Sequence, residues 1–256
     1  MAWNPDKYNE FKSFRYKPFY DLIELISGVE PGKKVIDMGC GTGELTRILA
    51  DKLTDPLVVG IDSSKEMLAK AEEEFGSKNI KFEQRTIEEQ IGTGEKWDII
   101  FANASIQWVE DHKKILPQMI SLLYSGGQLA IQIPAQNENL LNQIVYALVQ
   151  EEPYSKALDY WKRTFPILSL DEYAQLLFEN GGKNSTVYEK VYPLVVQDHN
   201  ELYELISGST LVPYFERLNG DIKEQFSKEL KNRIKNQFKK MPALYAFKRI
   251  LIYAEF

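Results

Sequence analysis

The residues with the clearest potential for chemistry lie in one short segment, residues 34–44, which reads KVIDMGCGTGE. An apolar run ends in the acid Asp37, and three glycines follow at alternate positions: Gly39, Gly41 and Gly43. Glycines in such a turn let the backbone bend tightly and let a ligand approach the chain closely. A helix predicted to begin at Glu44 would offer its free backbone N–H groups to a polar ligand. The segment is therefore typical of a loop that binds a nucleotide-type cofactor.

The spacing of the glycines disfavours a dinucleotide. The dinucleotide fingerprint has a glycine at its sixth position, but the sixth residue counted from Gly39 is Glu44, and counted from Gly41 it is Thr46. A carboxylate at the helix start repels a pyrophosphate, whereas Asp37 and Glu44 together suit a cationic ligand. S-adenosylmethionine (SAM) carries an ammonium and a sulfonium and no phosphate, so the loop predicts SAM, with S-adenosylhomocysteine as product. A simple strand-to-helix turn without a ligand is the alternative.

A second acid fits the adenosine part of that cofactor. The apolar run Leu57–Ile61 is followed by Asp62, about 20 residues beyond the glycines, where a carboxylate can accept hydrogen bonds from both ribose hydroxyls. Ser63 or Ser64 can cap the helix predicted over residues 65–75. Asp62 could also serve as that cap, and the two roles are compatible.

The elements that must position these residues alternate along the first half of the chain. Five segments are predicted strands: Lys34–Asp37, Leu57–Asp62, Lys81–Gln84, Asp98–Asn103 and Gln128–Ile133. Helical patterns lie between them, and two later strands are predicted at Thr186–Val196 and Phe247–Ala254. The alternation predicts an α/β fold with a doubly wound, mostly parallel seven-stranded sheet. Ligands bind such sheets at the carboxyl ends of strands, where Asp37, Asp62, Thr86, Ile87 and Asn103 fall.

The second half of the chain changes character. Residues 134–185 and 199–245 read as helical and aromatic, and we expect them to form cap insertions in a single domain of residues 1–256. A cap encloses a site and excludes water from it. Residues 1–28 are predicted to form lid helices. Arg15 lies there among aromatic residues and could meet an anionic substrate, although an ordinary amphipathic helix with a snorkelling arginine explains the pattern equally well.

The amino-acid composition limits the classes of partner and ligand that we expect for this protein. The net charge of −6 and the isoelectric point near 5.2 disfavour nucleic-acid binding, and without a long apolar run we expect no membrane contact. The single cysteine, Cys40, excludes an intramolecular disulfide and fits the cytoplasm; we expect it to pack as a small residue. With only His112 and His199, we expect no metal site, and we interpret His112 as a solvated residue in a first helical turn. The oligomeric state is left open.

The glycine loop, Asp62 and the strand alternation over residues 30–133 resemble the class I SAM-dependent methyltransferases. A closer resemblance, to the trans-aconitate methyltransferases, covers nearly the whole chain. It is carried by WNPDKY at residues 3–8 with Phe11, Arg15 and Pro18, FANASIQW at 101–108 with Asp111 and His112, SGGQLAIQIP at 125–134, STLVP at 209–213 and FKRILIYA at 247–254. Those enzymes convert a carboxylate to a methyl ester.

The resemblance implies roles for the residues at matching positions. For the cofactor, it implies that Asp37, Gly39 and Gly41 bind the methionine part, that Asp62 binds the ribose with Ser63 beside it, and that Thr86 and Ile87 flank the adenine. Asn103 and Ala104 would lie beside the sulfonium. Gln107 and Trp108 would form the pocket floor, and Arg15 would bind a small anionic substrate. Two positions depart from the family. Thr86 stands where the family often has an acid, and Val212 where it tends to have an arginine. Lys162, Arg163 and Arg217 are cations that could compensate for the second departure.

The chemistry implied is methyl transfer from SAM to a carboxylate oxygen of a small organic acid. Such a carboxyl has a pKa near 4 and is already ionised at neutral pH, so no general base is needed, which agrees with a chain that shows no obvious base. One alternative keeps SAM but transfers the methyl group to an oxygen, nitrogen or carbon of another metabolite, with a base from the cap. Another is a SAM-binding protein without transfer activity. A dehydrogenase is the least favoured alternative.

Overall fold

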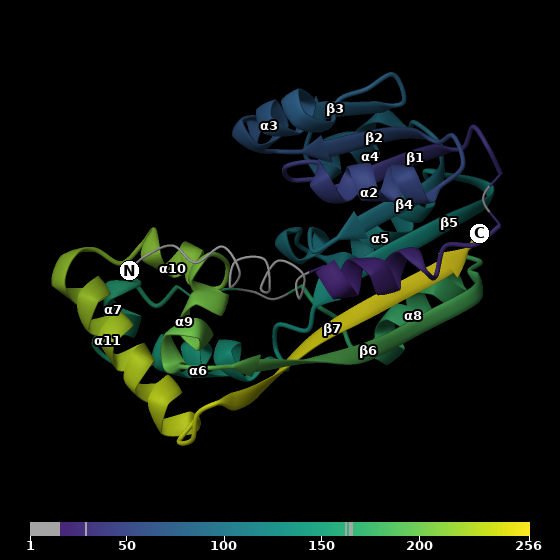
Figure 1. Cartoon of the computed structure of the whole chain (residues 1–256). Helices are drawn as coiled ribbons and strands as arrows, with labels where there is room; N and C mark the ends of the chain where they lie inside the picture. Colours follow the sequence, from purple (N-terminus) through teal and green to yellow (C-terminus); the bar gives the residue numbers. More distant parts are fainter. Residues whose placement is uncertain (1–15, 29, 162, 164–165) are drawn as a thin grey trace. The chain divides into compact units, whose positions relative to one another are not determined.

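The computed structural model describes residues 16–28, 30–161, 163 and 166–256, and the chain divides into two compact units (Figure 1). The sheet unit comprises Met1–Pro134, Pro166–Lys190 and Arg249–Phe256. The helical unit comprises Ala135–Phe165 and Val191–Lys248. Each unit is described by itself below. Among the described residues, every helix is too short or too polar to cross a membrane.

A seven-stranded sheet has the strand order β3-β2-β1-β4-β5-β7-β6. Strands β1 to β5 are parallel, and β7 runs antiparallel to β5. The bounds are β1 Lys34–Met38, β2 Leu57–Asp62, β3 Ile80–Gln84, β4 Trp97–Asn103, β5 Leu123–Pro134, β6 Lys183–Val196 and β7 Ala243–Glu255. The predicted doubly wound, mostly parallel sheet is therefore confirmed, and every predicted strand lies within an observed one or within a residue of its end.

The strand order places the predicted site residues at one edge. From β1 the chain moves outward through β2 and β3, then returns to the other side of β1 with β4 and β5, so the order reverses between β1 and β4. Asp37 pairs with Gly60 on β2 and with Phe101 on β4. The carboxyl ends of these three strands therefore meet at the switch point, where parallel sheets bind their ligands.

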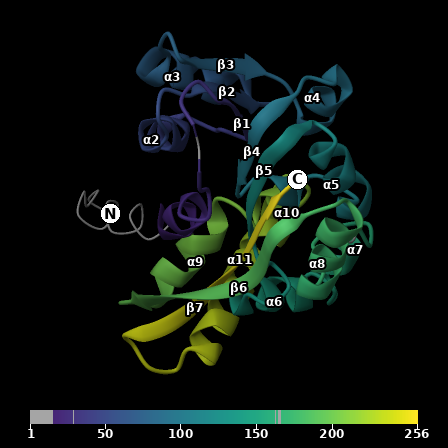
Figure 2. The ribbon, with the colours of Figure 1, turned by 90° about the vertical axis from the view of Figure 1, so that its right-hand side faces the viewer.

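Helices cover both faces of the parallel strands. Figure 2 shows α2 (Glu44–Lys52) and α3 (Lys65–Phe75) on one side, and α4 (Ile87–Thr93) and α5 (His112–Ile120) on the other. The turn η1 (Ile106–Trp108) precedes α5. The core under α2 is formed by buried apolar side chains from helices and strands alike, including Phe19, Val35, Leu49, Phe101 and Leu251. Burying such side chains is the main stabilising contribution to this layered arrangement.

Part of the predicted N-terminal lid packs into the core of the sheet unit. Residues 1–15, Arg15 among them, lie outside the described residues, and residues 16–23 are helical. Phe19 and Leu22 are fully buried, and both belong to the core of the sheet unit. This part of the predicted lid is thus a packed helix, because its apolar side chains supply core volume.

The helical unit contains α6 (Leu140–Leu148), α7 (Tyr154–Ala157), α9 (His199–Ser207), α10 (Val212–Phe215) and α11 (Gly220–Gln237). The long helix α11 packs against α6, α7 and α9, and it buries Phe226, Leu230 and Ile234, which share one face at helical spacing. Arg233 on α11 makes two hydrogen bonds to the carboxylate of Glu151, at 2.8 and 2.6 Å.

The structure divides the second half differently from the two predicted insertions. Residues 166–190, which include α8 (Leu170–Glu179), cluster with the sheet unit, although we predicted residues 134–185 as one cap segment. The reason is Tyr173 on α8, which is fully buried and contacts α5 through His112. The later segment, Val191–Lys248, contains the predicted 199–245.

Candidate functional site

A cavity of about 550 Å³ lies in the sheet unit at the carboxyl ends of the strands. It is lined by Gly39, Gly41, Ile61, Asp62, Ser63, Ser64, Met67, Arg85, Thr86, Ile87, Glu88, Ala104, Ser105, Trp108 and Val109. Eight of these residues were predicted from the sequence: Gly39, Gly41, Asp62, Ser63, Thr86, Ile87, Ala104 and Trp108. A cavity of this size suits a ligand as large as an adenosyl cofactor.

The glycine loop is shaped so that side chains would block it. Gly39 has φ +89°, and a Cβ there would lie 2.3 Å from the Cβ of Ser105. Gly43 has φ +78°, and its Cβ would lie 2.7 Å from the ring of Phe82. These φ values favour glycine, and the first contact shows that the loop after β1 packs tightly against the loop after β4. Both loops line the cavity, so their separation sets its width.

Asp62 is fixed by two backbone N–H groups. Its Oδ2 accepts a hydrogen bond from the N–H of Gly41 at 3.0 Å, and its Oδ1 accepts one from the N–H of Ser64 at 2.9 Å. The cap of α3 is Ser64, whose hydroxyl accepts from the N–H of Met67. Ser64 therefore fills the capping role that we had also considered for Asp62. Each carboxylate oxygen can accept more than one hydrogen bond, so Asp62 keeps acceptor capacity toward the cavity.

Asp37 lies beneath the glycine loop and does not line the cavity wall. It is buried, and its Oδ2 accepts a hydrogen bond from the Thr46 hydroxyl at 2.6 Å. Burial raises the pKa of Asp37 to about 6; the hydrogen bond from Thr46 lowers it, and the nearby charge of Asp62 raises it further. A cation placed next to Asp37 would reverse this balance and favour the carboxylate.

Buried polar atoms cluster at the end of β4 and on the segment that follows it. Among the described residues, Asn103 Oδ1, Ser105 Oγ and Gln107 Oε1 have no hydrogen-bond partner. The same holds for Nε2 of Gln132, the register partner of Asn103 on β5. Buried polar groups normally have partners, so this cluster fits a site that a polar ligand completes. Of these four residues only Ser105 lines the cavity, and its buried hydroxyl together with the narrow glycine cradle fits SAM.

Two of the predicted residues, Gln107 and Glu44, lie outside the lining of the cavity, and Trp108 belongs to it. Gln107 is buried and donates from Nε2 to the carbonyl of Ala104 at 2.7 Å; it does not line the cavity and instead fixes Ala104, whose φ is +54°. Trp108 lines the cavity but is 53% exposed. The carboxylate of Glu44 accepts a hydrogen bond from Tyr16 at 2.7 Å and lies outside the lining.

Thr86, which stands where an acid was expected, caps α4. Its hydroxyl accepts from the N–H of Glu89, and the Glu89 side chain accepts in return from the N–H of Thr86. Two residues later, Glu88 lines the cavity with an exposed side chain. Sequence reasoning missed Glu88, Ser105 and Arg85. The only available signal was that each lies within four residues of a predicted strand end.

The interpretation of His112 as a solvated residue is wrong. The side chain is 1% exposed. Its Nδ1 lies 2.6 Å from the hydroxyl of Tyr173, and its Nε2 lies 2.8 Å from the carbonyl of Ile106. Because a carbonyl only accepts, Nε2 carries the proton and Nδ1 accepts from Tyr173. Burial lowers the pKa of His112, so the ring is neutral at neutral pH and joins η1 to α8.

We therefore expect His112→Ala to affect stability and not chemistry. Removing the ring leaves the buried Tyr173 hydroxyl without its hydrogen bond to Nδ1, which costs about 1–3 kcal/mol, in addition to the cavity. Urea unfolding at neutral pH measures the loss, and kcat should change less than about threefold. In the wild type, His112 contributes fully to the free energy of unfolding above about pH 6.5. This contribution declines below that value, because the unfolded chain then binds a proton that the folded chain excludes. A large fall in kcat with unchanged stability would contradict this assignment.

Known proteins are similar to this chain in sequence. A family model described as a methyltransferase domain matches residues 29–212. A protein from Deinococcus radiodurans named trans-aconitate 2-methyltransferase is 36% identical over 99% of this chain and 98% of its own length. One of the same name from Mycobacterium tuberculosis is 32% identical over 99% of this chain and 96% of its own.

Solved structures agree on the fold. The YcgJ protein from Bacillus subtilis superposes with a TM-score of 0.59 at 17% identity, covering 94% of this chain and 98% of that one. Phosphoethanolamine N-methyltransferase 2 from Haemonchus contortus, solved with SAM, gives a TM-score of 0.56 at 16% identity, covering 92% of this chain and 51% of that one.

The fold, the cavity and these matches define the class: the chain belongs to the methyltransferase-domain family and is a class I SAM-dependent methyltransferase. Its cofactor is SAM. Within that class, it is similar along its whole length to proteins named trans-aconitate 2-methyltransferase.

Proposed function

We propose that this enzyme transfers the methyl group of SAM to a carboxylate oxygen of a small organic acid similar to trans-aconitate, and forms a methyl ester. One observation carries the proposal: the 36% identity to a trans-aconitate 2-methyltransferase extends over 99% of the chain. The similarity therefore includes the helical unit as well as the sheet unit that holds the cofactor cavity.

The proposed reaction does not need a general acid or a general base. SAM, when bound, supplies an electrophilic methyl group, and an ionised carboxylate is a sufficient nucleophile without a base. Among the described residues that line the cofactor cavity, none is a histidine or a lysine. The chain's own residues would then bind, orient and exclude water, and orientation alone can supply roughly 7–11 kcal/mol.

We assign cofactor contacts from the chemistry of the side chains. The buried carboxylate of Asp37 would hold the ammonium, and Asp62 would accept from the ribose hydroxyls. Ile87 and Met67 would pack against the adenine, where Glu88 would accept from the exocyclic amino group in place of the acid that Thr86 replaces. Each assigned side chain except that of Asp37 lines the cavity.

Asp62→Ala should weaken SAM binding by about 1–3 kcal/mol, because two hydrogen bonds to ribose hydroxyls are lost. Isothermal titration calorimetry with SAM measures the change. Asp171→Ala, which removes an exposed aspartate in the first turn of α8, is the matched control and should bind SAM as the wild type does. Unchanged binding by Asp62→Ala would refute the ribose assignment.

A carboxylate acceptor also predicts a flat pH profile. With SAM and acid both saturating, kcat should stay constant between about pH 6.5 and 9, because a carboxyl group with a pKa near 4 is fully ionised throughout. Below about pH 6 the KM for SAM should rise, because Asp37, with a pKa of about 6, becomes protonated. A rising limb of kcat between about pH 7 and 9 would instead favour a phenol or amine acceptor and a base.

Two alternatives remain. In the first, the enzyme transfers the methyl group to an oxygen, nitrogen or carbon atom of a different metabolite. In the second, the protein binds SAM without transferring its methyl group. A panel of di- and tricarboxylic acids incubated with enzyme and SAM, followed by mass spectrometry, separates them. We expect a mass gain of one methylene unit on an acid. SAM binding without any methylated acid would overturn the proposed ester formation.

A further inference from the structure

An exposed thioether forms part of the wall of the cofactor cavity. Met67, in the first turn of α3, lines that cavity and is 46% exposed. The other methionines among the described residues are better shielded, because Met38 and Met119 are fully buried and Met241 is half-buried. In the described part of the chain, the thioether most accessible to solvent therefore lies in the cofactor cavity.

The sulfur atom of Met67 lies close to the glycine loop. Gly41 has φ +56°, and a Cβ at that position would lie 3.9 Å from Sδ of Met67. The N–H of Gly41 donates to Oδ2 of Asp62 at 3.0 Å. The backbone of Met67 is itself fixed, because its N–H donates to the Ser64 hydroxyl at 3.3 Å. The thioether thus lies in the same part of the cavity as the carboxylate that we assign to the ribose.

The one cysteine of the chain is protected from oxidation. Cys40 lies in the same loop, but its side chain is buried, and its Sγ donates to the carbonyl of Gly41 at 3.8 Å. Burial raises the pKa of Cys40, and the charges of Asp37 and Asp62 raise it further, so the thiol stays protonated at neutral pH. Oxidation of a cysteine requires an exposed thiolate, whereas oxidation of a thioether does not depend on the loss of a proton. A peroxide that enters the cavity therefore meets Met67 as its reactive sulfur.

The oxidation of Met67 needs only hydrogen peroxide. An electron pair of the sulfur attacks one oxygen of the peroxide and forms an S–O bond, the O–O bond breaks, and the second oxygen leaves as water with both protons. The sulfur is oxidised by two electrons, and the peroxide is reduced. A flexible apolar side chain is converted to a polar sulfoxide, which methionine sulfoxide reductases can reduce again.

A sulfoxide at this position opposes the binding of SAM. Its oxygen is a hydrogen-bond acceptor that water solvates while the cavity is open. When the adenosine part of SAM covers residue 67, that water is lost, and burying a polar group without a partner is unfavourable. The added oxygen also takes up space beside the loop at Gly41. Conversely, SAM that is already bound covers the thioether and shields it from peroxide.

We propose that Met67 is an oxidation site through which peroxides control SAM binding: the enzyme without cofactor is converted to the Met67 sulfoxide and loses affinity for SAM, and bound SAM prevents the oxidation. The inference rests on our assignment of Met67 to the adenine wall and does not involve the acceptor of the methyl group. Peroxide would then inactivate enzyme molecules that lack the methyl donor and spare those that hold it.

Peroxide treatment followed by calorimetry tests the proposal. The full-length protein is exposed to hydrogen peroxide with or without saturating SAM, catalase then removes the peroxide, dialysis removes the cofactor, and SAM is titrated. Without protection, the affinity for SAM should fall at least about fivefold, and mass spectrometry of peptides should locate one added oxygen on Met67. Protein treated in the presence of SAM should keep its affinity and carry less oxygen on Met67. Methionine sulfoxide reductases should restore the affinity of the oxidised protein.

Three variants separate Met67 from other targets of peroxide. Met67→Leu keeps an apolar side chain of similar volume, and peroxide should leave its affinity for SAM unchanged within about twofold. Met241→Leu removes a half-buried methionine of the helical unit and should remain as sensitive to peroxide as the wild type. Met67→Gln imitates the polar sulfoxide and should bind SAM at least about threefold more weakly before any treatment. Circular dichroism checks that each variant folds.

Two results would overturn the proposal. The first is wild-type protein that keeps its affinity for SAM after treatment, whether or not Met67 has gained an oxygen. The second is an equal loss of affinity in the wild type and in Met67→Leu, because damage elsewhere would then be the cause. The proposed function is tested separately on untreated protein: if no ester forms while SAM binding remains sensitive to peroxide through Met67, ester formation is refuted and the oxidation site stands.

Discussion

Gly39→Ala is expected to lower SAM affinity roughly 100-fold or more while the protein remains folded, because the cradle has no space for one methyl group. The new Cβ would lie 2.3 Å from the Cβ of Ser105, and the backbone at Gly39 has φ +89°. The loops after β1 and β4 must then separate, and both line the cofactor cavity. Calorimetry with SAM measures the affinity, and circular dichroism checks the fold.

Two further variants make this expectation specific. Gly92→Ala adds the same methyl group at a position where no atom lies within 4 Å, and it should bind SAM normally. The double variant Gly39→Ala/Ser105→Gly removes the clashing Cβ, leaving a backbone strain of about 1–3 kcal/mol, and should recover much of the affinity. If Gly39→Ala alone binds SAM within about threefold of the wild type, the close packing of the two loops is not what shapes the cradle.

Asp37→Asn is expected to abolish most SAM binding and to stabilise the protein without its cofactor. The pKa of Asp37 is raised from 3.8 to about 6, chiefly by burial. The folded chain therefore holds a proton that the unfolded chain releases between these two values, and stability falls as pH rises through that window. At neutral pH the buried charge then costs up to about 3 kcal/mol. A neutral asparagine avoids this cost and can still accept from Thr46.

The same substitution removes the negative charge that we assign to the SAM ammonium. A hydrogen bond to a charged group contributes about 1.5–3 kcal/mol, so the affinity should fall roughly 10- to 150-fold. Thermal unfolding without SAM and calorimetry with SAM measure the two effects. A melting temperature clearly below that of the wild type, or retained SAM binding, would contradict the assignment. The matched substitution Asp171→Asn on the surface should change neither quantity.

Much of this site could be predicted from the sequence because its signals are local. Strand-length apolar runs that end in Asp37 and Asp62 define both the sheet and its ligand-binding edge. The alternate glycines mark a tight turn, and two of them, Gly39 and Gly43, have φ values that favour glycine and no space for a side chain. In a parallel sheet the strand ends meet at one edge, so the convergence of these residues followed from the element order alone.

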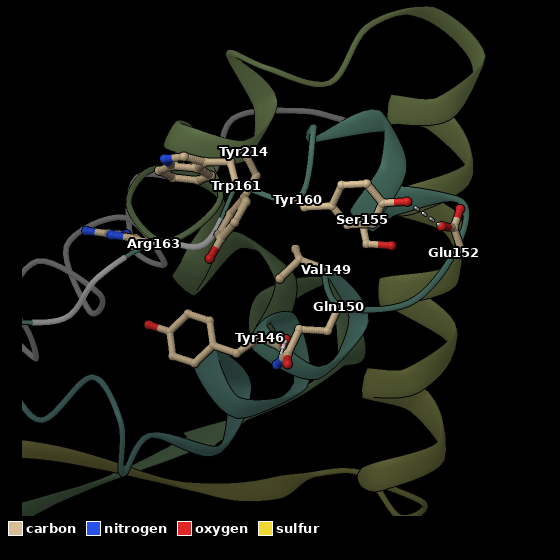
Figure 3. A pocket seen from close by; sticks show the side chains of 9 residues that line it. All are labelled: Tyr146, Val149, Gln150, Glu152, Ser155, Tyr160, Trp161, Arg163 and Tyr214. Carbon is tan, nitrogen blue, oxygen red and sulfur yellow. Dashed lines mark hydrogen bonds between the residues drawn. The ribbon is translucent and has the colours of Figure 1, made fainter.

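What could not be predicted depends on partners far away in the sequence. His112 reads as a polar residue at a helix start, and only its contact with Tyr173, 61 residues later, reveals that it is buried. The same contact places α8 with the sheet unit, which a helical pattern does not distinguish from a cap helix. Ser105 has no motif of its own, since its importance comes from the approach of Gly39. A second cavity, whose lining includes Arg163 and Tyr214 (Figure 3), likewise joins residues about 50 positions apart.

One measurement tests most directly whether the enzyme makes a methyl ester. The protein is incubated with SAM carrying a deuterated methyl group and with trans-aconitate, and the product is isolated and treated with alkali. We expect the acid to gain the label and alkali to release it as deuterated methanol, because only an ester bond hydrolyses under these conditions. A label that stays on the product after alkali, or an acid that gains no label while SAM is bound, would contradict ester formation.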